Sequence, residues 1–462
     1  MSEPVGTQAT GETQPASAGA SGAGDDWPSP ARAWYTIWLI AFVTMLSNVD
    51  RNIINLLVQP IKRDLALSDT QISLIIGFAF SSAYMVVGLP MARVADQRSR
   101  KMILTAGLTV WSLATALCGM ARSFGGLFFA RGVVGGAESV AGPSSMSMIA
   151  DMVPRSKLPR AFAVYQLGIS AGQATALLAG GLLVAFFAGM GPVHIPVLGE
   201  MREWQLVFLV CALPGLATAL LFLFTVREPV RRNRRGKGSV PLREVGAYLL
   251  SNRILFLPLF LSIGIGAIET TGLMTWRAAF YERTYGWGPA QIGPLLALSL
   301  LISTPIALTL GTWFAEYMGK RGNPDAMARV CFYSQALSAP FAIATSLMPS
   351  PWLAFFCGMI SSIIGLASAP AQNAAIQMVT PSEMRAQISA VYLFTISVIG
   401  NGLGPLLIAL VTDFLLKDES MLRYSMAFFA AVMAPGGAAL MYLAIKPYAQ
   451  AVRSSGFREP SR

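Results

Sequence analysis

Apolar runs of bilayer length constrain this chain more than any other feature. A helix that crosses the hydrocarbon core of a membrane needs about 20 apolar residues. Such runs lie at 34–58, 72–95, 102–121, 124–149, 161–188, 204–226, 254–280, 290–315, 327–347, 352–377, 387–413 and 424–446. Only 12% of the 462 residues are charged, which is about half the usual share in a soluble domain. The sequence therefore predicts an all-α polytopic membrane protein with twelve transmembrane helices.

One long polar link divides the runs into two sets of six. We expect an N-terminal six-helix bundle at 34–226, a cytoplasmic linker at 227–253 and a C-terminal six-helix bundle at 254–446. Residues 1–33 are rich in Gly, Ala, Ser, Thr and Pro and contain no apolar signal-peptide segment. We expect them to form a disordered cytoplasmic tail, with a second cytoplasmic tail at 447–462.

Basic residues are unevenly distributed between the two sets of links. If the N-terminus is inside, most of the 34 Lys and Arg residues fall on the cytoplasmic side, as the positive-inside rule requires. The net charge of +11 is then mainly an orientation signal, and the run RRNRRGK can touch anionic headgroups. We expect a monomer in the inner (cytoplasmic) membrane, with lipids and a small-molecule or lipid substrate as partners and no nucleic acid.

A weak internal repeat relates the two halves. Tyr165 ends the segment MVPRSKLPRAFAVY, and Tyr392 ends the similar VTPSEMRAQISAVY. Asp96 in RVADQRSRK likewise corresponds to Glu316 in WFAEYMGKR. Two parallel six-helix repeats are typical of secondary transporters, whose binding site lies between the halves near the membrane midplane.

Ionisable residues lie inside the first and fourth runs, where a charge is costly and marks a candidate functional site. Asp50 and Arg51 share the first run, and Arg131 and Glu138 share the fourth. The helical rise places Asp50 and Arg131 at a similar membrane depth, so they can pair. Glu138 follows Arg131 by seven residues, so it lies on the same face of the fourth helix, near the membrane midplane. Arg51 has three candidate partners: Asp50, Glu138 and the substrate.

The seventh run supplies the matching carboxylate of the second half, Glu269. A buried carboxylate near an arginine is balanced between opposing effects on its pKa, so it can change protonation as a cavity alternates between the two sides. The single histidine, His194, lies in an outer link. We therefore predict that carboxylates carry a coupled proton, namely Asp50, Glu138 and Glu269. The alternative is that these charges only pair to hold helices together.

Arginines and aromatic residues in the spans indicate the class of substrate. Arginine suits carboxylate and phosphate groups, and an apolar, aromatic lining suits an amphiphilic or aromatic body. The predicted substrate-binding residues are Arg51, Arg131, Glu138, Trp276, Arg277, Tyr84, Tyr165 and Tyr392. Arg277 can alternatively reach the outer surface, and the tyrosines can alternatively be core. A lysolipid and a small organic acid both fit this pattern.

Other motifs favour packing over chemistry. The four cysteines lie in apolar runs without CxxC spacing, and no metal-ligand cluster, histidine triad or phosphate loop occurs. We predict no catalytic residue, metal or cofactor, and an intramembrane enzyme is a distant alternative. GPSS (142–145) indicates a bend in the fourth helix. Asp413, at an outer helix end, is expected to be solvated.

The link ARVADQRSRK (92–101) resembles the G-x-x-x-D-R/K-x-G-R-R/K signature of the major facilitator superfamily. Asp96, Arg100 and Lys101 match the signature, whereas Gln97 replaces its first basic residue. The resemblance implies a cytoplasmic gate in which Asp96 pairs when the carrier is open outward. We assign gating roles to Asp96, Arg100, Lys101 and Glu316.

A narrower resemblance, to the Spinster-like branch, rests on NVDRNIINLLVQPIKRDLALSDTQISLIIGFAF and FFARGVVGGAESVAGPSSMSMIADMVP. It implies proton-linked carriage of lysophospholipids or sphingoid lipids, and it places Asp50, Arg51, Arg131 and Glu138 at coupling and binding positions. We expect a proton-coupled secondary transporter for an organic, anionic and amphiphilic solute, driven by the proton gradient. The alternative is an uptake symporter for an aromatic or other small organic acid.

Overall fold

The computed structural model describes residues 27–454 except 192, 197–198, 232–240 and 382–383. Most of the predicted tail at 1–33 and half of that at 447–462 lie outside the described residues. Within them the predicted all-α membrane fold is confirmed, and eleven helices are long and apolar enough to cross a membrane. The remaining predicted span, the fourth, is divided into two shorter helices.

The N-terminal half begins at Pro30, four residues before the predicted first run. Its helices are α1 (Pro30–Asn52), α2 (Val58–Leu65), α3 (Asp69–Ser73), α4 (Phe80–Gln97), α5 (Arg100–Met120), α6 (Phe124–Glu138), α7 (Ala141–Met152), α8 (Leu158–Ala188) and α9 (Glu203–Thr225). A π-helical segment, Leu74–Ala79, joins α3 to α4. The break between α6 and α7 lies beside GPSS, where the sequence predicts a bend.

The C-terminal half repeats this arrangement. Its helices are α11 (Arg253–Tyr285), α12 (Pro289–Lys320), α13 (Ala326–Leu347), α14 (Pro351–Leu366), α15 (Ser368–Val379), α16 (Arg385–Phe394), α17 (Asn401–Leu410) and α18 (Leu422–Ser454). α17 continues into a π-helical segment, Val411–Leu416. The last helix thus extends eight residues beyond the predicted end of the bundle at 446.

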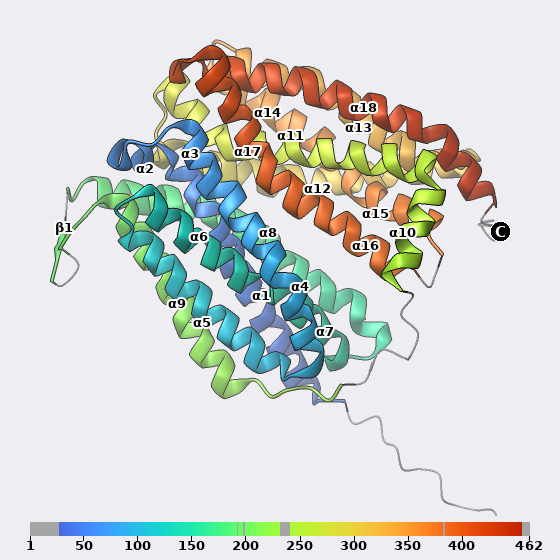
Figure 1. The fold of residues 1–462 in the computed structure, drawn as a ribbon, viewed down its shortest axis with the longest axis horizontal. Coiled ribbons are helices and arrows are strands. Elements are labelled where there is room, and N and C mark those ends of the chain that lie inside the picture. Colours follow the sequence, from blue (N-terminus) through green and yellow to red (C-terminus); the bar gives the residue numbers. More distant parts are fainter. Residues whose placement is uncertain (1–26, 192, 197–198, 232–240, 382–383, 455–462) are drawn as a thin grey trace, which may run out of the picture.

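Two elements outside the spans mark the two ends of the molecule. A two-stranded antiparallel hairpin, β1 (Val193–Ile195) and β2 (Gly199–Met201), follows α8 at what we call the hairpin end. At the opposite end, α10 (Leu242–Ser251) forms a short helix within the predicted linker, and we call this the linker end. Figure 1 shows helices of the two halves close together near α3 and α17 and diverging toward α10.

Glycines let the two halves touch at the hairpin end. A Cβ atom on Gly293 of α12 would lie 2.5 Å from the Leu177 carbonyl oxygen of α8. A Cβ atom on Gly77, between α3 and α4, would lie 2.4 Å from the Asn401 carbonyl oxygen of α17. Both distances are too short for any side chain, so these helix pairs require glycine to approach this closely.

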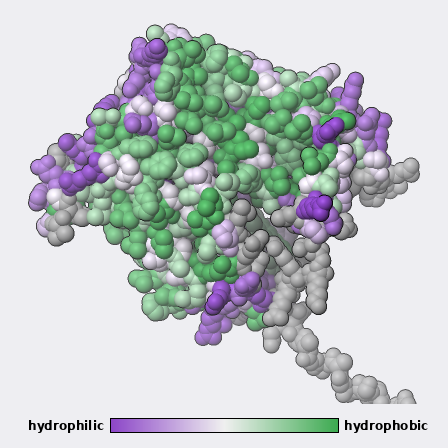
Figure 2. Space-filling model, viewed as in Figure 1, coloured by the Kyte–Doolittle hydropathy of each residue, from purple (hydrophilic) through white to green (hydrophobic). Residues whose placement is uncertain are grey.

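Large apolar side chains cover much of the outer surface. Phe129 and Phe224 are 70% and 80% exposed, and Figure 2 shows apolar residues over most of the visible face with hydrophilic residues gathered at its margins. An exposed apolar surface of this extent is expected for helices that face lipid.

Candidate functional site

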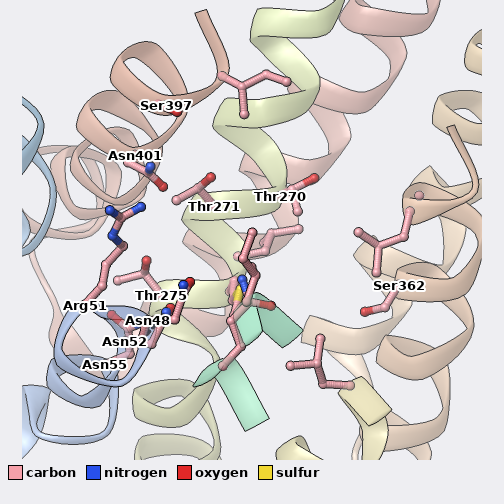
Figure 3. Close-up of a pocket in the computed structure, with 18 of the residues that line it drawn as sticks. Asn48, Arg51, Asn52, Asn55, Thr270, Thr271, Thr275, Ser362, Ser397 and Asn401 are labelled. Atoms are coloured by element: carbon pink, nitrogen blue, oxygen red, sulfur yellow. Dashed lines mark hydrogen bonds between the residues drawn. The ribbon is translucent and has the colours of Figure 1, made fainter. Parts of the chain in front are cut away.

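A cavity of about 570 Å³ lies between the two halves. α1, α4 and α8 line one side of it, and α11, α12, α14 and α17 line the other. Figure 3 shows polar side chains of α1 facing those of α11 and α17 across this space. The cavity has the position that the sequence predicts for a transporter binding site, between two six-helix repeats.

Arg51 and Glu138 form an ion pair in the wall of this cavity. The Arg51 Nη2 atom lies 2.9 Å from Glu138 Oε2, and the Ser47 hydroxyl donates to the same oxygen at 3.0 Å. The Arg51 guanidinium also lies 4.6 Å from the centre of the Phe80 ring, a cation–π distance. Of the two carboxylates that the sequence allows as partners of Arg51, the structure pairs it with Glu138, and its contact with substrate stays a prediction.

Asp50 and Arg131 lie behind this pair and do not line the cavity. Arg131 Nη1 donates to the backbone carbonyl of Asp50 at 3.2 Å, and both residues are at most 3% exposed. The Asp50 carboxyl group is adjacent to Trp111 and Thr115. The two residues are therefore neighbours as predicted, but the bond between them uses the backbone of Asp50 and not its carboxylate. In this conformation Arg131 does not reach a cavity-bound solute.

Glu269 and Arg277 of α11 both line the cavity on the C-terminal side. Glu269 is 7% exposed. Both outer nitrogens of Arg277 lie 3.5 Å from the Ser362 hydroxyl, and no carboxylate lies within ion-pair distance of it among the described residues. Arg277 thus faces the cavity and does not extend to the outer surface, which was the alternative.

The predicted aromatic residues divide into two groups. Tyr84 and Tyr165 line the cavity, and Tyr84 stacks on Phe80 with ring centres 5.9 Å apart. Trp276 is fully buried outside the cavity, with its indole N–H bonded to the Pro405 carbonyl. Tyr392 is 4% exposed in the apolar core of the C-terminal half. In this conformation neither Trp276 nor Tyr392 lines the cavity, because both side chains are buried in protein, and their contact with substrate stays a prediction.

The predicted gating residues lie at the linker end. Arg100 is 2% exposed and bonds Glu228, Asp151 and the Ser147 side chain, which all belong to the N-terminal half or the segment that follows it. The backbone N–H of Lys101 also donates to Glu228, at 2.8 Å. These contacts stabilise one half, and none of them joins the two halves.

Asp96 and Glu316 share that end of the molecule. The side chain of Asp96 lies outside the described part of the structure. Glu316, on α12, is exposed. Their gating roles therefore stay predictions.

A buried ionic cluster at the hairpin end was not predicted. Asp69 receives two bonds of 2.7 Å from Arg283 and one from Lys62, and it is fully buried. Lys62 also pairs with Glu419 at 2.9 Å. We call these four residues the hairpin-end cluster. It joins the halves, because Lys62 and Asp69 belong to the first and Arg283 and Glu419 to the second.

Further hydrogen bonds join the halves beside this cluster. The Asp413 carboxylate accepts bonds of 2.6 Å from both the backbone N–H and the hydroxyl of Thr70. The Ser73 hydroxyl donates to the Pro405 carbonyl at 3.1 Å. The expectation that Asp413 is merely solvated is therefore wrong, since its carboxylate binds the first turn of α3 across the interface. The halves are thus joined at the hairpin end.

Sequence reasoning also missed a row of asparagines on α1 and the turn that follows it. Asn48, Asn52 and Asn55 line the cavity together with Arg51. Intervals of three and four residues place all four on one helix face, and this spacing was the signal that could have revealed them. Among the described residues, no cluster of three metal-ligating side chains occurs.

Comparison with known proteins decides the family. The sequence profile of the Major Facilitator Superfamily matches residues 40–405. The chain belongs to the Major Facilitator Superfamily. Members of this superfamily are transporters and not enzymes, so the intramembrane-enzyme alternative is set aside.

Individual relatives point to the Spinster-like branch. Human protein spinster homolog 1 is 24% identical over 90% of this chain and 81% of its own. A bacterial homologue of the human lysosomal transporter Spinster, solved inward-facing and unoccupied, superposes with a TM-score of 0.75 at 25% identity, over 94% of this chain and all of that one. An MFS-type efflux pump of Mycolicibacterium smegmatis is 27% identical over 92% of this chain and 95% of its own. The chain is a multi-pass secondary transporter with Spinster-like relatives.

Proposed function

We propose that this protein is a proton-coupled carrier of an organic anion with an apolar body, such as a lysolipid or sphingolipid-like molecule. The observation that carries the proposal is the Arg51–Glu138 pair in the wall of a cavity between two halves that are bonded to each other at the hairpin end. Alternating access would expose this cavity to each side of the membrane in turn.

Competition at Arg51 supplies a physical route to coupling. In the structure, Glu138 satisfies the Arg51 charge, and the side chain of Glu138 is fully buried. Protonating Glu138 would remove this partner and free the guanidinium for an anionic group of the cargo. Binding of the anion and binding of the proton then favour each other, which is the linkage that a proton-coupled carrier needs. Asp50 and Glu269 are two further carboxylates that can exchange protons during the cycle.

The lining of the cavity supports the substrate class. Arg277 is a cation without a carboxylate partner among the described residues, so it attracts an anionic group. Ile76, Phe80, Leu177 and Leu296 supply apolar surface in the same wall. An amphiphile satisfies both features. The cavity volume is also within the range of drug-sized ligand sites, about 300–1,000 Å³, so a small aromatic or other organic acid is the second candidate.

Positive-inside charge assigns the two ends of the protein to the two sides of the membrane. The linker end carries Arg100, Lys101, α10 and the C-terminal end of α18, and we place it in the cytoplasm of a cell with an inner membrane. The hairpin end is then outside, so the joined hairpin end describes a carrier open to the cytoplasm. The inward-facing Spinster homologue, with its TM-score of 0.75, supports this assignment.

Transport by purified protein in liposomes tests the proposal. We expect an imposed pH gradient to drive accumulation of a radiolabelled octanoyl lysophospholipid or of labelled benzoate, whichever is the cargo. Arg277→Gln should reduce this accumulation at least tenfold, since it removes the cation of the anion site. Glu200→Gln, on the exposed strand β2, is the control and should transport normally. Gradient-driven transport that is indifferent to Arg277→Gln would contradict the anion assignment.

A further inference from the structure

One face of α1 and its following turn presents hydrogen-bond acceptors to the cavity. Asn48, Asn52 and Asn55 lie on this face beside Arg51, and Figure 3 shows them as a row along one wall. None of them is charged, so none is explained by the anion and proton chemistry proposed above. Three amide groups in one wall of a binding cavity raise the question of what they recognise.

Local bonding fixes the orientation of two of these amides. The Nδ2 atom of Asn48 donates to the Thr44 carbonyl at 2.9 Å, and the Nδ2 atom of Asn52 donates to the Asn48 carbonyl at 2.8 Å. A backbone carbonyl can only accept, so the nitrogen must face the helix in each case. The Oδ1 atoms are left without a donor among the described residues, and they are available to a solute in the cavity.

Two buried acceptors in the same wall have no hydrogen-bond partner in the described part of the chain. They are the Oδ1 atom of Asn55, which is 9% exposed, and the Oε1 atom of Glu138. A buried acceptor that remains unpaired costs about 1–3 kcal/mol. Both atoms are closed off from the cavity in this conformation, so a cargo with N–H or O–H donors would remove that cost once the wall opens to admit it, whereas a cargo with methyl groups there would leave it in place.

The wall on the C-terminal side carries a cationic hydrogen-bond donor. Arg277 offers donors on the C-terminal side, where its guanidinium donates to the Ser362 hydroxyl, and Figure 3 shows Ser362 across the cavity from Asn48 and Asn52. A solute that satisfies both walls carries an anionic group toward Arg277 and donor groups toward α1. The cavity is therefore complementary to a headgroup with two different ends.

We propose that Asn48, Asn52 and Asn55 are specificity-determining residues, which select anionic solutes whose headgroup also carries primary ammonium or hydroxyl donors. This inference rests on the proposed function, since it concerns the cargo of that same site. Arg51 does not repel an ammonium group there, because Glu138 balances its charge in the observed state and the anionic group of the cargo balances it once Glu138 is protonated.

A matched pair of probes tests the inference. Octanoyl lysophosphatidylethanolamine and octanoyl lysophosphatidylcholine share the acyl chain, glycerol and phosphate, and differ in whether the nitrogen carries three N–H donors or three methyl groups. Binding of each probe to the full chain in lipid nanodiscs is followed by tryptophan fluorescence. We expect the wild-type protein to bind the ethanolamine probe at least tenfold more tightly.

Variants locate the preference on α1. Asn55→Leu removes the buried acceptor. Asn52→Thr removes the amide oxygen but keeps a hydroxyl that can donate to the carbonyl of residue 48, in the way that the Thr44 hydroxyl donates to the Ile40 carbonyl. We expect either change to reduce the preference to below threefold, with affinity for the choline probe unchanged within twofold. Asn252→Leu is the matched control, because Asn252 also bonds a carbonyl four residues back but lies outside the cavity. It should keep the full preference.

The outcomes separate this inference from the function on which it rests. Equal wild-type binding of the two probes, or a preference that survives in the folded Asn52→Thr protein, overturns the role of the asparagines. If Arg277→Gln then weakens both probes equally, the anion carrier stands and only the specificity proposal falls. Binding of neither probe overturns the specificity proposal and removes lysophospholipids from the candidate cargoes.

Discussion

The hairpin-end cluster should hold the carrier in its observed conformation, and Asp69→Asn tests this directly. Asp69 is fully buried and accepts two bonds from Arg283, which lies on the other half of the molecule. Asparagine has the same size but no charge, so the substitution removes the ionic interaction with little change in packing. We expect it to favour the conformation in which the hairpin end opens.

The geometry sets the size of this effect. Lys62 and Asp69 belong to the same half and stay together when the halves separate, so among the described bonds of Asp69 those with Arg283 are the ones that distinguish the two conformations. A hydrogen bond to a charged group contributes about 1.5–3 kcal/mol, and asparagine can still accept one bond. A net loss of about 2 kcal/mol changes the ratio of closed to open hairpin ends about 30-fold.

Distances between spin labels measure that ratio. Labels at Met190 and Met421, exposed positions of the two halves at the hairpin end, report the separation in a background without native cysteines. Asp64→Asn is the matched control, since the partners of Asp64 among the described residues, Arg202 and Trp204, belong to its own half. We expect a longer-distance population in Asp69→Asn alone. Identical distance distributions in both variants would refute the assignment of the cluster as a latch between the halves.

Three further changes give separate tests. Burial raises the pKa of Glu228, but bonds from the Lys101 N–H, Arg100 and Ser99 outweigh burial and hold the pKa below its usual range. At pH values above the unfolded pKa, near 4.3, the ionised carboxylate therefore stabilises the fold by about 1 kcal/mol after solvent screening. Melting curves should show Glu228→Gln less stable than wild type at pH 7, and equally stable once the pH falls below the lowered pKa of the folded state. Gly293→Val should prevent closure of the hairpin end, because its Cβ atom would lie 2.5 Å from a carbonyl oxygen, and normal transport rates in liposomes would contradict this. Asp50→Asn should abolish proton-driven transport, and unchanged accumulation under a pH gradient would remove Asp50 from the coupling role.

Much of the architecture is predictable because the bilayer imposes a length on each apolar run. The run that contains Arg131 and Glu138 was found in this way, and its break lies beside GPSS as the sequence indicates. The ionisable residues of these runs are informative for the same reason, because a charge at membrane depth needs a partner or a function.

What the sequence could not supply is the rotation of helices and the pairing of residues far apart in the chain. Trp276 and Tyr392 lie in the expected spans, but the packing of neighbouring helices buries both side chains behind residues that line the cavity. Asp69 and Arg283 lie at helix ends, where a solvated charge is the usual expectation. Their contact depends on how the halves meet in this conformation, which no local pattern specifies.

Proton movement through Glu138 tests the central claim most directly. Liposomes that contain the protein and an internal pH-sensitive dye are mixed with the cargo identified by the transport assay, with no pH gradient imposed. The account predicts that cargo addition changes the internal pH with the wild-type protein, and that Glu138→Gln still exchanges labelled cargo but produces no pH change. Equal pH changes with both proteins would show that the Arg51–Glu138 pair does not couple protons to transport.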